Sequence, residues 1–106
     1  EVSARLGEAI GLAPYKGVFF RLGVGKAFRS VGRLDEAEAV LLEAHRIDPY
    51  NGEVAYQLGE IAFAQEDYVG AIRYFTIVRS STSSLAPFAG KRLDDARARM
   101  KAQLKG

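Results

Sequence analysis

Apolar residues recur along this chain at intervals of three and four positions, the spacing that lines one face of a helix. Short polar, glycine-containing or proline-containing segments interrupt the pattern, and we expect them to be turns. The pattern predicts six helices, over residues 1–13, 17–31, 34–47, 52–65, 68–79 and 85–106. Helices of this length joined by short turns are typical of helical hairpins.

Individual residues predict where these helices begin and end. Pro14 is expected to end the first helix, because proline disfavours helical geometry in the residue before it. Gly32 is expected to provide the turn before the third helix. Asn51, Asp67 and Ser84 are expected to cap the three later helices, since their side chains can accept backbone hydrogen bonds.

The pattern also repeats within the chain at nearly fixed spacing. We call the separation between Gly25 and Gly59 along the chain the repeat period. The same separation is found between Phe28 and Ala62, Ala37 and Ala71, Leu41 and Phe75, and Ala44 and Val78. With a spacing one position longer, Val2, Leu6, Ala9 and Pro14 match Ala37, Leu41, Ala44 and Pro49. Self-similarity at such a period is the signature of a repeat protein.

These residues resemble the tetratricopeptide repeat, whose period is about 34 residues and whose pattern places a Leu-Gly pair in one helix and Ala-x-x-x-Phe in the next. The closer copy is Ala55-x-x-Leu58-Gly59-x-x-Ala62, followed by Ala71-x-x-x-Phe75. The earlier copy is Arg21-x-x-Val24-Gly25-x-x-Phe28, followed by Ala37-x-x-x-Leu41 and closed by Pro49. Arg21 and Ala55 replace the usual tryptophan, and Ala62 replaces the usual tyrosine.

The resemblance implies an all-α fold, a right-handed superhelical solenoid of helix-turn-helix hairpins with about six helices. We expect one domain over residues 1–106 in a fragment of a longer protein. Its parts are the second helix of a truncated repeat (1–16), two full repeats (17–51 and 52–84) and a C-terminal capping helix (85–106). The expected repeat-packing residues are Gly25, Ala37, Leu41, Ala44, Gly59, Ala71 and Phe75. The glycines are expected to let the helices approach closely through Ala37 and Ala71.

The resemblance also implies a non-enzymatic scaffold that binds a peptide or helix of another protein in a concave groove lined by first helices. Stepping 100° per residue away from the packing positions predicts which side chains line the groove. They are Phe19, Leu22, Lys26, Arg29, Glu53, Tyr56, Glu60 and Phe63. For Phe19 and Phe63, packing against a neighbouring repeat is the competing interpretation.

Little in the sequence indicates chemistry. The chain has no cysteine and a single histidine, His45, which lacks the helically spaced ligand partner that a metal site needs. Adjacent carboxylates such as Asp35 and Glu36 suit helix capping. We therefore expect no catalytic residue, cofactor or metal. No apolar run approaches the ~20 residues that cross a bilayer, so direct membrane insertion is not expected.

Two other functions remain open. The first is self-association through the terminal helices, because a cut solenoid exposes an apolar end. The second is binding of RNA or an anionic surface, since residues 86–106 hold six Lys or Arg against two Asp. The basic residues are Lys91, Arg92, Arg97, Arg99, Lys101 and Lys105. Solvation of a capping helix is the simpler interpretation of these charges, so nucleic acid is not the expected partner.

Overall fold

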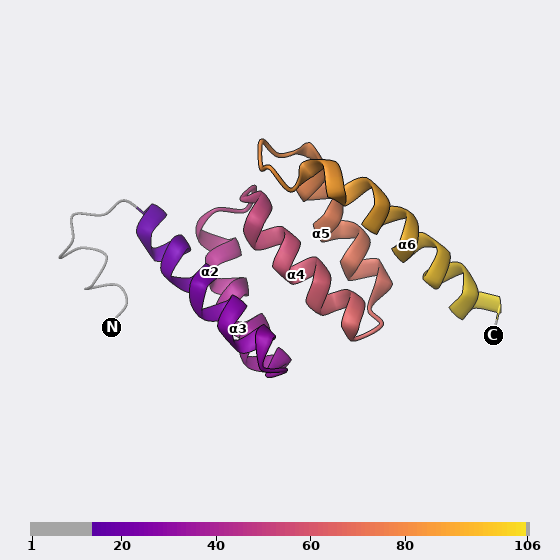
Figure 1. Cartoon of the computed structure of the whole chain (residues 1–106), viewed down its shortest axis with the longest axis horizontal. Helices are drawn as coiled ribbons and strands as arrows, with labels where there is room; N and C mark the ends of the chain where they lie inside the picture. Colours follow the sequence, from indigo (N-terminus) through magenta and orange to yellow (C-terminus); the bar gives the residue numbers. More distant parts are fainter. Residues whose placement is uncertain (1–13, 106) are drawn as a thin grey trace. The chain divides into compact units, whose positions relative to one another are not determined.

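The computed structural model describes residues 14–105, and this part of the chain is helical between its loops (Figure 1). Its helices are α2 (Pro14–Ser30), α3 (Leu34–Ile47), α4 (Gly52–Ala64), α5 (Tyr68–Ser80) and α6 (Ala86–Lys105). No strand occurs in residues 14–105, which confirms the all-α prediction at this level. The predicted helix over residues 1–13 lies outside the described residues. None of the described helices is long and apolar enough to span a membrane.

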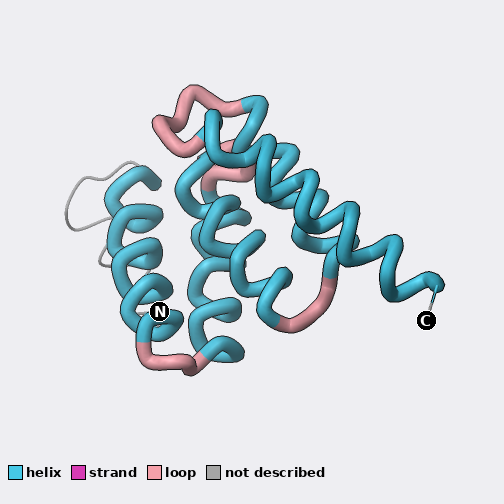
Figure 2. Tube along the Cα trace, turned by 45° about the vertical axis from the view of Figure 1, so that its right-hand side comes forward, coloured by secondary structure: helices cyan, strands magenta, loops and turns pink. Residues whose placement is uncertain are grey.

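The chain divides into two compact units, residues 1–49 and 50–106. In the first unit, α2 and α3 pack against each other as a hairpin. In the second, α4 and α5 form a hairpin and α6 packs against α5. Figure 2 shows the short loop within each hairpin and the longer loop that leads into α6. The single domain over residues 1–106 stays a prediction.

The two hairpin turns have the same backbone geometry, and they lie one repeat period apart. Gly32 has φ 82° and Glu66 has φ 62°, both in the left-handed region. In the first turn the amide of Arg33 donates to the carbonyl of Phe28 at 2.9 Å. In the second, the amide of Asp67 donates to the carbonyl of Ala62 at 2.8 Å. Both turns are therefore Schellman caps, which satisfy the last carbonyls of the preceding helix.

The two hairpins also share a contact between a glycine and a large side chain. A Cβ atom added at Gly25 would lie 2.4 Å from Cγ of Leu41, and one added at Gly59 would lie 2.8 Å from the ring of Phe75. Leu41 and Phe75 are fully buried, as are Ala37 and Ala71. The side chains that lie against the two glycines are therefore Leu41 and Phe75, and not the predicted Ala37 and Ala71.

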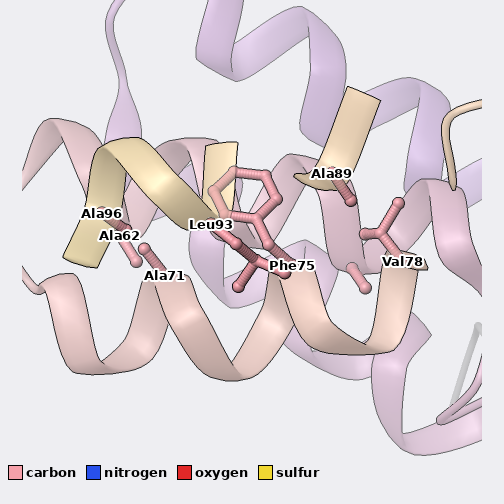
Figure 3. Close-up of a cluster of buried hydrophobic side chains, with 8 residues drawn as sticks. Ala62, Ala71, Phe75, Val78, Ala89, Leu93 and Ala96 are labelled. Atoms are coloured by element: carbon pink, nitrogen blue, oxygen red, sulfur yellow. The ribbon is translucent and has the colours of Figure 1, made fainter. Parts of the chain in front are cut away.

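Small side chains bring α6 close to the α4–α5 hairpin. Figure 3 shows Leu93 of α6 beside Phe75 of α5, with alanines from three helices around them. The cluster consists of Ala55, Ala62, Ala71, Phe75, Val78, Ala89, Leu93 and Ala96. Ala89 and Ala96 follow Ala55 and Ala62 by one repeat period, so α6 continues the spacing of the first helices.

Two predicted caps are confirmed, whereas the predicted start of the second helix and the predicted cap of the last helix are wrong. Oδ1 of Asn51 accepts from the amide of Val54, and Oδ1 of Asp67 accepts from that of Gly70, each at 3.0 Å. The second helix, predicted to begin at residue 17, begins at Pro14 instead. The helix expected to end at Pro14 lies outside the described residues. A proline at the first position of a helix costs no hydrogen bond, because the backbone N–H that it lacks would have no partner within the helix. Before α6, the amide of Leu85 donates to the hydroxyl of Ser83, and Ser84 lies in the turn.

Candidate functional site

Four of the eight predicted groove residues lie on α2, and they differ in accessibility. Phe19 is 60% exposed and Lys26 is also exposed, whereas Arg29 is half-buried. Leu22 is only 7% exposed, so its side chain offers little surface to a ligand. The predicted set is therefore split on this helix, with Phe19 and Lys26 on its exposed side.

The exposed side of α2 contains residues that the sequence analysis did not include. Phe20 is 65% exposed, and Gly23 and Ala27 are exposed on the following turns. We define the α2 face as the exposed residues Phe19, Phe20, Gly23, Lys26 and Ala27. The available signal was the apolar character of α2 on more than one side, which marks a helix packed twice or used for binding.

The other four predicted residues lie on α4, and three of them contact other helices of the second unit. Glu53 is exposed, while Tyr56, Glu60 and Phe63 are half-buried. The ring of Tyr56 meets that of Phe75 edge-on, with centroids 5.6 Å apart and planes at 70°. Packing within the second unit thus covers much of the surface that was predicted to bind a ligand.

Arg92 of α6 accounts for the positions of Glu60 and Phe63. Its Nε and one terminal nitrogen donate to the two carboxylate oxygens of Glu60, both at 2.9 Å. Its guanidinium carbon lies 4.2 Å from the ring centroid of Phe63 and 5.6 Å from that of Phe75. A forked pair of charged hydrogen bonds combined with stacking on aromatic rings is the interaction for which arginine is best suited.

The charge of Arg92 is stabilised where it lies. Burial by itself lowers the pKa of the Arg92 guanidinium, but hydrogen bonding to Glu60 and the charge of Glu60 outweigh it. The pKa of Arg92 is therefore raised above its ordinary value, and Asp95, 3.4 Å from a terminal nitrogen, adds to this. The pair is a fixed internal link between α4 and α6.

Three of the six basic residues of α6 have a contact with an acidic or aromatic side chain, and three have none among the described residues. Arg92 binds Glu60, Arg99 lies 5.5 Å from the ring centroid of Phe63, and Arg97 lies 3.9 Å from Asp94. The exposed side chains without such a contact among the described residues are Lys91, Lys101 and Lys105. No aromatic side chain is interleaved with these three lysines, as a surface that stacks bases would require.

His45 lies on α3 and is half-buried. Burial lowers the pKa of the His45 imidazole, because the charged form loses hydration. Within residues 14–105, no three His, Cys, Asp or Glu side chains come together in a way that could hold a metal ion.

No protein-family model, curated protein or solved structure matches this chain. The resemblance to the tetratricopeptide repeat thus stays an inference from its own residues.

Proposed function

We propose that this chain is a helical-repeat scaffold that binds a peptide or helix of another protein, and that the α2 face provides the binding surface. The observation that carries the proposal is the exposure of two adjacent phenylalanines, Phe19 at 60% and Phe20 at 65%. Large aromatic side chains dominate the energetics of protein interfaces, and lysines beside them fix orientation and partner choice. Lys26 lies in that position.

The repeat architecture supports the scaffold part of the proposal. The Gly25–Leu41 contact recurs as Gly59–Phe75, and the turn at Gly32 recurs at Glu66, each one repeat period later. Units that repeat with this period stack into a right-handed solenoid of the tetratricopeptide type. We propose that architecture for the chain, since solenoids present extended surfaces for binding.

We place the binding surface on α2 rather than on α4, because three of the four predicted groove residues of α4 already contact α5 or α6. Glu60 and Phe63 are bound by Arg92, and Tyr56 packs on Phe75. Binding through these three residues would first require the loss of two charged hydrogen bonds, each worth roughly 1.5–3 kcal/mol. Of the predicted residues, Phe19 and Lys26 need no such rearrangement.

The test compares variants of the α2 face for binding to a partner captured from the source cell. Phe19→Ala and Lys26→Glu should each weaken its affinity, by roughly tenfold for Phe19→Ala if this residue is an interface anchor. Phe88→Ala is the matched control, because Phe88 is also 60% exposed but lies on α6. Equal affinity of all three variants and the wild type would exclude the α2 face as the binding surface. Light scattering over a range of concentrations separates this function from self-association.

A further inference from the structure

We infer that the occupant of the α2 face is an amphipathic helix flanked by acidic side chains. The inference rests on the proposed function and adds the chemistry of the partner. It follows from three properties of α2, namely the spacing of its exposed apolar residues, the open space above Gly23 and the sign of its charge.

The apolar part of the α2 face extends over successive turns. Phe20, Gly23 and Ala27 are spaced by three and four residues, so they lie along one side of the helix. Among the described residues, a Cβ atom added at Gly23 would meet nothing within 4 Å, so none of their contacts explains the glycine. Glycine in a helix interior costs about 1 kcal/mol relative to alanine. Because glycine has no side chain, a second backbone can approach α2 closely at this position.

The equivalent positions of α4, the first helix of the second hairpin, are buried. Val54, Gln57 and Ile61 follow Phe20, Gly23 and Ala27 by one repeat period, and they are 0%, 7% and 1% exposed. An elongated occupant with helical periodicity fits three residues spaced along one side of a helix, because ridges and grooves of two helices interlock.

The positive charge of α2 determines which charge is favourable on the residues that flank the apolar stripe of the bound helix. The helix, Pro14–Ser30, contains no aspartate or glutamate. The charge of Arg21 is neutralised by Glu43, whose Oε1 accepts from Nε of Arg21 at 2.9 Å. Lys26 is exposed and forms no ion pair within the described part of the chain. Acidic residues beside the apolar stripe of an incoming helix would complement Lys26, whereas basic ones would be repelled.

A tryptophan reporter tests the inference in the full chain, which contains no native tryptophan. Phe20→Trp is titrated with two helical alanine- and leucine-based peptides of about 18 residues, one flanked by glutamates and one by lysines. The glutamate peptide should shift the emission to shorter wavelength and bind about fivefold more tightly than the lysine peptide at low salt. Adding Lys26→Glu should reverse this preference. Phe88→Trp, the matched control on α6, should respond to neither peptide.

Each other result overturns the inference in a distinguishable way. Equal binding of both peptides would show that the partner need not be acidic. Equal responses of Phe20→Trp and Phe88→Trp would show that binding does not occur specifically at the α2 face. Short-wavelength emission without peptide would identify another part of the chain as the cover, or a second copy if it appears only as concentration rises. If neither peptide binds while Phe19→Ala still weakens capture of the cellular partner, the proposed function stands and the acidic helix is excluded.

Discussion

Leu41 of α3 lies directly against Gly25 of α2, so closely that a Cβ atom at position 25 would be 2.4 Å from Cγ of Leu41. Cγ is the branch point of the leucine side chain, and it cannot move away without displacing both methyl groups. The same arrangement joins Phe75 to Gly59 in the second unit. In each hairpin the distance between the helices is thus set by a glycine and the large side chain seated on it.

Substituting alanine for Gly25 and for Gly23 should change stability in opposite directions. Gly25→Ala should lower the free energy of unfolding by about 1–2 kcal/mol, because overpacking outweighs the gain in helix propensity. Gly23→Ala should raise it by roughly 0.5–1 kcal/mol, since the added methyl group meets no described residue within 4 Å. Urea denaturation measures both. Stabilisation by Gly25→Ala would contradict the close approach of Leu41.

The left-handed residue of each hairpin turn should also be sensitive to substitution, again with opposite signs. Glu66→Gly should stabilise the protein by about 0.5–1 kcal/mol, because glycine relieves the Cβ strain at φ 62°. Gly32→Ala should destabilise it by roughly 1 kcal/mol for the same reason at φ 82°. Thermal unfolding with circular dichroism detects both changes. A loss of stability in Glu66→Gly would show that its side chain contributes more than its backbone strain costs.

Arg92→Ala should lower the free energy of unfolding by about 1–2 kcal/mol, because Glu60 would lose its forked partner and Phe63 its stacked cation. Arg97→Ala on the same helix is the control, and its change should stay within about 0.5 kcal/mol, since Arg97 is exposed and 3.9 Å from Asp94. A double-mutant cycle with Glu60→Ala measures the coupling directly. Equal effects of the two arginine substitutions would refute the special role of Arg92.

His45 should make stability depend on pH in mildly acidic solution. Burial lowers the pKa of His45 in the folded state below its ordinary 6.5, so the unfolded chain takes up the proton first as pH falls. Its contribution is therefore complete above pH 6.5 and is lost progressively below it. Urea midpoints measured between about pH 7 and 5.5, above the range of ordinary carboxylates, should decline in the wild type. The decline should be shallower in His45→Gln, and parallel curves would contradict this account.

Much of the helical layout follows from the sequence because the decisive signals are local. The periodic stripe of α3 gave its bounds, and Asn51 and Asp67 were recognisable as caps from their position before an apolar stripe. The start of α2 was predicted too late, because a proline can mark the end of one helix or the first residue of the next. The residue before a proline avoids helical geometry whether a helix ends there or a new one begins.

The candidate site was harder to predict because it depends on contacts between distant residues. Arg92 and Glu60 are 32 positions apart, and nothing local to α6 distinguishes Arg92 from its basic neighbours. The pairing of Ala89 and Ala96 with Ala55 and Ala62 at the repeat period was the available signal that α6 lies in register with α4. On α2, angular position alone did not separate buried Leu22 from exposed Phe19.

Photo-crosslinking inside the source cell tests the central claim, binding through the α2 face, most directly. The photoreactive residue p-benzoylphenylalanine replaces Phe19 in one variant and Phe88, which is equally exposed on α6, in another. We expect position 19 to give a discrete crosslinked protein that is lost when Lys26→Glu is added, and position 88 to give none. Crosslinks at position 88 alone, or at both positions alike, would contradict the claim.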